Sequence, residues 1–166
     1  MLGHHMTPTP LTAKSWLALI AWLAIAFLPA AIGATSPPDA WFLTLRTPPL
    51  NPPGWLFAPV WTALYVSIAV AAWLLWQRAP WPTARAPWLA FTAQLALNAA
   101  WTPLFFGLHR PDLALGCILA LDLAIAACIA TWWPRRRAAA LLLVPYAAWV
   151  AFATYLNFGF WWLNRG

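Results

Sequence analysis

The sequence WLAFTAQLALNAAWTPLFF at residues 88–106 is uncharged, mainly apolar and long enough to cross a bilayer as a helix. Four of its residues recur at spacings of four, three and four, which places them in one stripe of an α-helix: Gln94, Asn98, Trp101 and Phe105. Two amides against lipid would be costly, so this stripe must face protein or water. The segment therefore predicts a membrane helix with a partly polar inner face.

The opposite side of the same helix carries the small residues Ala96, Ala100 and Gly107. Ala96 and Ala100 form a small-xxx-small pair, which allows the backbones of two membrane helices to approach closely. We expect this face to form a homodimer contact. Ordinary packing within the chain explains the alanines equally well.

Four further segments have the same apolar character, at residues 15–34, 55–76, 113–133 and 138–162. Hydrophobic residues make up 64% of the chain, charged residues make up 7%, and the mean hydropathy is +0.70. These values exclude an ordinary soluble protein. The sequence predicts an all-α, multi-pass integral membrane protein with one domain of five transmembrane helices at residues 15–166. Residues 1–14 are expected to be disordered or vector-derived.

The basic residues are distributed unequally between the two sides of the membrane in this five-helix arrangement. One side is expected to carry Arg46, Arg110 and Arg165, and the other to carry Lys14, Arg78, Arg85, Arg135, Arg136 and Arg137. By the positive-inside rule the amino terminus is cytoplasmic and the carboxyl terminus lies outside. Because the charges are spread over loops, nucleic acid is not expected as a partner. We expect the protein to lie in a bacterial cell envelope.

Prolines dominate the connection between the first two helices, at residues 35–54, which also carries Trp41 and Phe42. Proline restricts its own φ angle and the residue before it, so this loop should follow a defined path and act as a lid. Four of the five spans also contain a proline: Pro29, Pro59, Pro103 and Pro145. Kinks at these residues would open a cavity beneath the loop.

Two other spans repeat the pattern of aromatic and polar residues on one face. The second carries Trp61 and Tyr65, and the fifth carries Tyr146, Trp149, Ala153 and Asn157. We interpret these stripes, with Asn98 and Trp101, as the walls of an internal binding site. Asp122, near the middle of the fourth span, is expected to make a structural hydrogen bond, because a proton relay needs further titratable groups.

The residues that hold metals and redox cofactors are not placed for that purpose. The histidines are terminal or in a loop, both methionines lie in the first six residues, and Cys117 and Cys128 lack ligand spacing. We expect no metal and no cofactor. A ligand would be held by ring stacking, shape and a few hydrogen bonds.

Several motifs occur in a recognisable order. They are Pro52-Pro53, VWTALY at residues 60–65, Gln94 with Asn98, WTPLFF at 101–106, Pro145-Tyr146 with Trp149, and ATYLN at 153–157. In this order the chain resembles the translocator protein family, also called tryptophan-rich sensory proteins or peripheral benzodiazepine receptors. The resemblance runs from about residue 33 to residue 164 and covers all five spans.

The resemblance implies a five-helix bundle, commonly dimeric, that binds porphyrins, benzodiazepine-type ligands and in some members sterols, in a pocket under the first loop. It places Trp61 and Trp149 in that pocket, lined further by Trp41, Pro52, Asn98 and Ala153. The family pattern KPxWxPP is changed here at Thr47 and Leu50. Sterol binding is the least supported, because after Tyr155 the next basic residue is Arg165, outside the spacing of the proposed cholesterol motif.

We therefore expect a membrane receptor or translocator for protoporphyrin-like tetrapyrroles and other hydrophobic aromatic ligands, surrounded by membrane lipid. One alternative is an enzyme that degrades porphyrin in the light, for which Trp61 and Trp149 would be the catalytic residues. Another is a scaffold that recruits partners through the face of Ala96.

Overall fold

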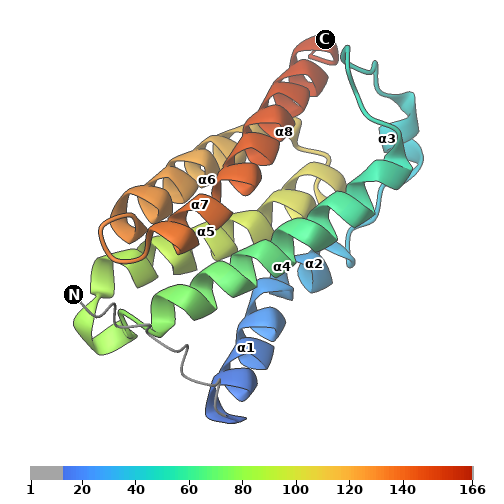
Figure 1. Ribbon diagram of the computed structural model, residues 1–166. Helices are drawn as coiled ribbons and strands as arrows, with labels where there is room; N and C mark the ends of the chain where they lie inside the picture. The colour runs from blue at the N-terminus through green and yellow to red at the C-terminus, as the bar shows by residue number, and fades with distance from the viewer. Residues whose placement is uncertain (1–12, 166) are drawn as a thin grey trace, which may run out of the picture.

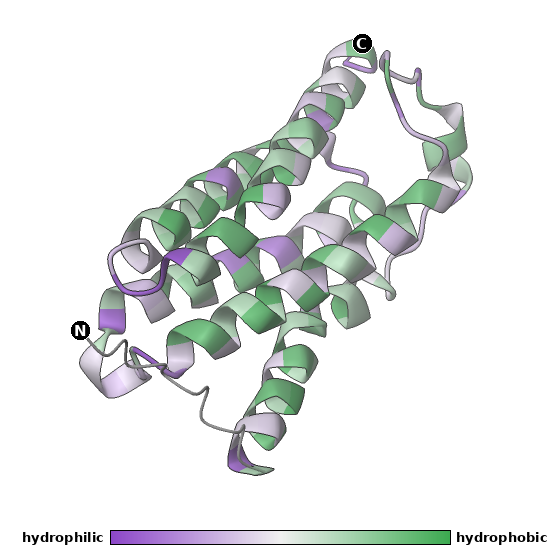
Figure 2. Ribbon diagram, viewed as in Figure 1, coloured by the Kyte–Doolittle hydropathy of each residue, from purple (hydrophilic) through white to green (hydrophobic). Residues whose placement is uncertain are grey.

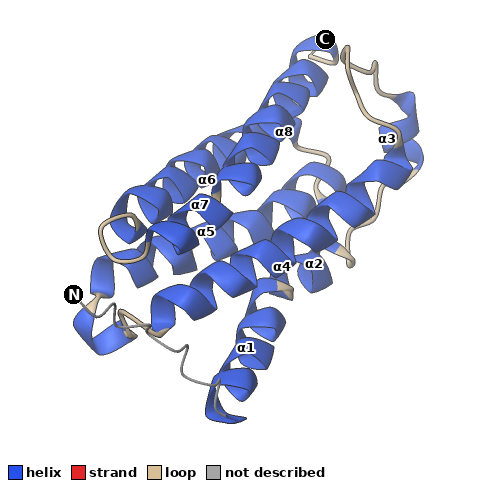
Figure 3. Ribbon diagram, viewed as in Figure 1, coloured by secondary structure: helices blue, strands red, loops and turns tan. Residues whose placement is uncertain are grey.

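The computed structural model describes residues 13–165, and within this range the regular structure is entirely helical (Figure 3). The first twelve residues of the expected disordered segment lie outside the described part. The first helix begins at Ala13, two residues earlier than expected.

Five long apolar segments could cross a membrane: Ala13–Gly33, Gly54–Trp76, Arg85–Gly107, Pro111–Trp132 and Arg137–Leu163. They agree with the predicted spans to within a few residues, and the chain is an integral, multi-pass membrane protein. Their helical elements are α1 (Ala13–Ala26), α2 (Leu28–Gly33), α4 (Phe57–Trp76), α5 (Arg85–Thr102), α6 (Pro111–Trp132), α7 (Arg137–Leu142) and α8 (Val144–Leu163). Hydrophobic residues run along all of them (Figure 2).

The other regular elements are one short helix, α3 (Ala40–Thr44), and three turns: the 3₁₀ turns η1 (Gly54–Leu56) and η2 (Trp81–Thr83), and the π-helical turn η3 (Pro103–Gly107). The spans lie side by side in a bundle (Figure 1), and their contacts follow a closed ring. In it α1 packs on α4, α4 on α7, α6 on both α8 and α5, and α5 on α2. The proline-rich connection, with α3, passes over one end of this ring, which we call the outer end.

The prolines interrupt three of the four spans that contain them. The first span breaks at Phe27, two residues before Pro29, and the third changes into a π-helical turn at Pro103. The fifth breaks at Leu143, two residues before Pro145. The expected kink at Pro59 is not formed, because Pro59 lies in the first turn of α4, where its missing N–H needs no partner.

The break in the fifth span is bound to its neighbour. The Ser67 hydroxyl donates to the Leu142 carbonyl across 2.7 Å, which joins α4 to the end of α7. A carbonyl without a partner inside a membrane would cost several kcal/mol, so this bond makes the interruption tolerable.

A chain of buried hydrogen bonds joins three helices at the middle of the ring. The Tyr65 hydroxyl donates to Asn98 Oδ1 at 3.1 Å, and Asn98 Nδ2 donates to the Tyr146 hydroxyl at 2.7 Å. The Tyr146 hydroxyl in turn donates to Gln94 Oε1 at 3.0 Å. The predicted polar stripe of α5 therefore faces inward and is paired with α4 and α8. We call these four side chains the tyrosine–amide network.

Asp122 makes the structural hydrogen bond that its position in the fourth span predicts. The Thr154 hydroxyl on α8 donates to Asp122 Oδ2 at 2.7 Å. The carboxyl group thus ties α6 to α8, the pair of helices that closes this side of the ring.

Replacing Tyr146 with phenylalanine should destabilise the bundle by about 1–3 kcal/mol, because it leaves the Asn98 amide and the Gln94 carbonyl without a buried partner. Thermal unfolding in detergent measures this loss. The matched control is Tyr155→Phe on the same helix, whose hydroxyl lies at the exposed surface and donates to the Pro49 carbonyl. Equal melting temperatures for the two variants would contradict a stabilising role for the network.

Candidate ligand-binding site

A cavity of about 590 Å³ lies between the outer halves of the helices, beneath the proline-rich connection. Its walls are mainly apolar and aromatic. Tyr65 and Asn98 form its inner end, and Pro37 and Pro38 of the connection form part of its cover. Every span contributes residues to the lining, including Pro29 and Gly33, Phe57 and Trp61, Trp101 and Phe105, Ile118 and Leu121, and Trp149 and Phe160. The cavity lies at the outer end of the ring, where sequence analysis predicted it.

The structure brings most of the predicted ligand-binding residues together. Those that line the cavity are Pro52, Trp61, Tyr65, Asn98, Trp101, Trp149, Ala153 and Asn157. Two others lie outside its lining. Tyr146 is fully buried behind Asn98, and Trp41 stacks on His109 at the outer surface. A helical stripe cannot distinguish a residue on the cavity wall from one behind it, and this explains why the sequence predicts Tyr146 as a lining residue.

Flat rings form the side walls of the cavity. Trp61 stacks on Tyr65 with ring centroids 5.3 Å apart and planes inclined by 28°. On the facing helix, Trp149 packs edge-on against Phe57 at 5.9 Å. Trp61 and Trp149 come from α4 and α8, so a planar molecule in the cavity would lie between indoles from two different helices.

The polar groups of the wall are mostly paired with each other. The Trp101 indole N–H donates to Asn157 Oδ1 at 2.8 Å, and Asn157 Nδ2 donates to the Pro111 carbonyl at the start of α6. The buried indole N–H of Trp149 has no acceptor among residues 13–165. The Trp101 ring is therefore held in place by a hydrogen bond, whereas no hydrogen bond within this range holds the Trp149 ring.

One end of the connection is fixed to α8. Asn164 binds the backbone of Arg46 at two points: Arg46 N–H donates to Asn164 Oδ1 at 2.8 Å, and Asn164 Nδ2 donates to the Arg46 carbonyl at 3.0 Å. The Tyr155 hydroxyl donates to the Pro49 carbonyl. Gly159 lets Pro48 approach so closely that a Cβ at position 159 would lie 2.5 Å from Pro48 Cβ.

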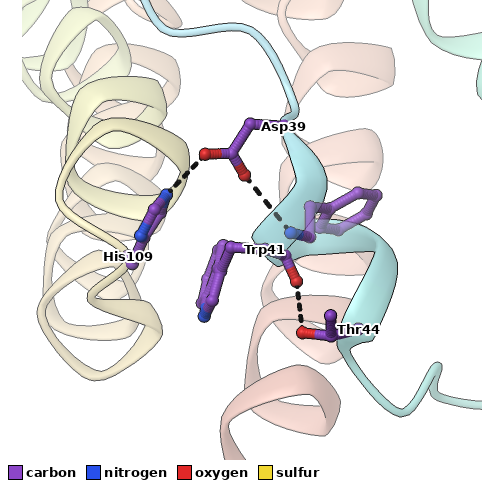
Figure 4. Close-up of polar contacts among 5 residues, drawn as sticks. Asp39, Trp41, Thr44 and His109 are labelled. Atoms are coloured by element: carbon purple, nitrogen blue, oxygen red, sulfur yellow. Dashed lines mark hydrogen bonds and ion pairs between the residues drawn. The ribbon is translucent and has the colours of Figure 1, made fainter.

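The other end of the connection is held by a histidine beyond α5 (Figure 4). Asp39 caps α3 by accepting the Phe42 N–H at 3.3 Å, and its other oxygen lies 3.0 Å from His109 Nε2. Trp41 stacks on the His109 ring at 4.3 Å. Phe42, which this cap positions, lines the cavity and packs against Phe105. The exposed contact between His109 and Asp39 is thus connected through α3 to the cavity wall.

The electrostatics of Asp39 follow from this arrangement. Desolvation raises the pKa of Asp39, but the Phe42 N–H and the His109 ring outweigh it, so the pKa lies below its ordinary value. Neither Asp39 nor His109 was identified from the sequence as part of the site. The signal available was an aspartate directly before a short helix, which is a preferred N-cap residue.

The predicted dimer face is only partly separate from the site. Ala96 and Ala100 are exposed on the outside of α5. Gly107 instead approaches the connection, where a Cβ would lie 2.9 Å from Ser36 Oγ. A close contact within the chain therefore explains why a glycine fits at position 107, without any contact between two subunits. The homodimer contact through the two alanines stays a prediction.

Within residues 13–165, no three His, Cys, Asp or Glu side chains are grouped so as to hold a metal ion. The cavity wall offers rings, amides and hydroxyl groups. Such a wall supports recognition by shape, stacking and hydrogen bonding, and the contact between His109 and Asp39 lies above it.

Comparison with known proteins finds a match to the TspO/MBR family over residues 18–163. The chain is 39% identical to a tryptophan-rich protein TspO of Archaeoglobus fulgidus, over 88% of this chain and 94% of that protein. It is 40% identical to the human translocator protein, over 76% of each chain. It is also 38% identical to a tryptophan-rich sensory protein of Cereibacter sphaeroides, over 86% of this chain and 89% of that one.

Gly159→Ala should loosen the connection, because the added methyl group occupies the space that Pro48 fills. Hydrogen exchange of residues 40–49 in detergent should then become faster. Gly116→Ala is the matched control, since nothing lies within 4 Å of a Cβ at that position. Unchanged exchange in the Gly159 variant would show that the connection is not held by its contact with α8.

The bonds of Asp39 predict a pH dependence. Because its pKa is lowered in the folded protein, the stabilisation by the carboxylate is complete above its ordinary pKa and is lost as the pH falls through the lowered value. An NMR titration of the Phe42 amide should show this step. Asp39→Asn should abolish the step and keep a capping oxygen, whereas Asp39→Ala should lose both. A step that persists in Asp39→Asn would assign the titration to another group.

Proposed function

The chain belongs to the TspO/MBR family, and from this premise we propose that its cavity binds protoporphyrin-like tetrapyrroles and other flat hydrophobic ligands. The observation that carries the proposal is the cavity itself, with Trp61 on one wall and Trp149 on another. Its volume of about 590 Å³ lies in the range of roughly 300–1,000 Å³ that is typical of sites for small molecules and cofactors.

Ring stacking would supply the main recognition. Aromatic pairs prefer offset or edge-to-face contact at ring centroid distances of about 4.5–7 Å and add about 0.5–1.5 kcal/mol each beyond the area that they bury. Trp61 already stacks on Tyr65 in this way, so a ligand ring would extend an existing stack. The apolar wall removes the rest of the ligand surface from water or lipid.

Hydrogen bonds would orient the ligand at the inner end of the cavity. Asn98 is 6% exposed and both of its side-chain atoms are engaged by tyrosines, so its position is fixed before a ligand enters. The indole N–H of Trp149 is buried without an acceptor among residues 13–165, so a small turn of this ring toward the cavity would offer a further donor to a ligand on the side wall. A site that is fixed in advance loses little conformational entropy on binding.

The connection would control access to the cavity from the outer side. Phe42, Pro37 and Pro38 cover it, and the connection is attached through separate contacts to α8 and to His109. Release of either attachment would open the cover without disturbing the spans. We further propose that the protein acts as a receptor or translocator, and as a homodimer through Ala96 and Ala100.

A second candidate function is light-dependent degradation of a bound porphyrin, with Trp61 and Trp149 as the reacting residues. The observation that favours it is that both indoles line the same cavity and that Trp61 is in direct ring contact with a tyrosine. Loss of porphyrin absorbance under illumination, but not in the dark, distinguishes this function from binding alone.

Replacing both Trp61 and Trp149 with phenylalanine should weaken protoporphyrin binding by roughly 2- to 10-fold for each indole, because the smaller rings stack less well. Quenching of tryptophan fluorescence in detergent measures the affinity. Trp81→Phe is the matched control, because this indole is exposed at the opposite end of the bundle. An affinity that the double variant retains would refute the site assignment.

A further inference from the structure

The inner end of the bundle, opposite the connection, carries positive charge without any acid. Its cationic residues lie where the spans begin and end: Lys14, Arg78, Arg85, Arg135, Arg136 and Arg137. The three acids of the chain lie elsewhere, Asp39 and Asp112 at the outer end and Asp122 within the fourth span. Ion pairs among residues 13–165 involve only Asp39 and Asp112. The inner end therefore needs its counter-charge from another molecule.

The turn between α6 and α7 concentrates three of these charges, and it forms a hydrophilic loop at the end of an apolar pair of helices (Figure 2). Its backbone is fixed, because the N–H groups of Arg135 and Arg136 both donate to the Trp132 carbonyl. Trp132 is fully buried and its indole donates to the Pro87 carbonyl on α5. The arginines are thus mounted on a rigid part of the fold.

Arg136 differs from its neighbours. Its Nε is buried and has no acceptor among the described residues 13–165. Arg135 is satisfied in part by the Thr131 carbonyl at 2.7 Å, and the Arg137 guanidinium lies 5.7 Å from the centre of the Trp133 ring. A buried guanidinium donor that lacks an acceptor is costly, so the half-buried Arg136 head group is favoured to shift toward an acceptor outside the protein. Phosphate oxygens match the planar donor geometry of a guanidinium.

Exposed apolar side chains adjoin the arginines on the membrane side. Leu141 is four residues after Arg137 and therefore lies on the same face of α7, about 6 Å further into the membrane. Leu141, Val144 and Trp133 are all exposed. A molecule bound to the arginines would be in contact with hydrocarbon directly beneath its charged group.

We infer that the α6–α7 turn is a binding site for the head group of an anionic phospholipid, with Arg136 as the principal phosphate ligand. Arg135 and Arg137 add charge, and the acyl chains lie along Leu141 and Val144. A soluble phosphate would use the arginines but not the apolar surface beneath them. The site is separate from the cavity, which lies at the outer end of the same helices.

The full-length protein in detergent, titrated with phosphatidylglycerol or phosphatidylcholine and observed by native mass spectrometry, tests this site. We expect the first phosphatidylglycerol to bind more tightly than phosphatidylcholine. Arg136→Gln should weaken it by roughly fivefold or more, the effect of one basic residue at an anionic surface. Arg136→Lys, which keeps the charge but lacks Nε, should recover only part of the affinity.

Lys14→Gln is the matched control, since it removes one charge from the same end of the bundle. Lys14 is in the first turn of α1, which lies apart from the α6–α7 turn (Figure 1). This variant should change the affinity for phosphatidylglycerol by less than about twofold. Porphyrin affinity should be unchanged in all three variants, which also shows that they are folded.

Three results would overturn the inference. If Arg136→Gln and Lys14→Gln lowered the affinity for phosphatidylglycerol equally, the lipid would be attracted by the charge of the whole inner end and not by a specific site. Equal affinity for phosphatidylcholine would show that the negative charge is not recognised. Full competition by glycerol 3-phosphate at the same concentration as the lipid would show a site for a soluble phosphate.

Discussion

The hydrogen bonds of the tyrosine–amide network are the interaction on which the rest of the structure depends. Amide and hydroxyl groups inside a membrane must be paired, and here Asn98 is paired with a tyrosine from each of two other helices. The pairing holds α4, α5 and α8 together at mid-depth. Above this level the same helices are free to diverge, and the network becomes the inner end of a cavity instead of the centre of a solid core.

Proline creates the space and the connection covers it. Breaks near Pro29 and at Pro103 redirect the outer ends of two spans, and the adjoining segments α2 and η3 both line the cavity. The connection is then attached at two places, by Asn164 at the end of α8 and by His109 beyond α5. The result is an aromatic cavity whose inner end is held by hydrogen bonds and whose outer end is covered by a separately attached segment.

Hydropathy and helical period predict the five spans and the inward stripe of α5. The reason is that a membrane helix must be long and apolar, and can carry polar side chains only on a face that contacts protein. The helical period shows that a side chain faces the bundle interior, but not whether it lines the cavity or lies behind the lining. For this reason the sequence predicts Tyr146 in the cavity together with Asn98, whereas Tyr146 lies behind Asn98. The position of Trp41 was missed for another reason. It depends on contacts between Asp39 and His109, which are 70 residues apart. Such contacts leave no local pattern in the sequence.

The binding site can be located by a structure of the protein with bound protoporphyrin, by crystallography or by electron microscopy in a lipid nanodisc. We expect density for the macrocycle between Trp61 and Trp149, with its inner edge against Asn98 and the connection closed over it. Density for the ligand on the lipid-facing surface, with side chains filling the space between the two indoles, would contradict the account.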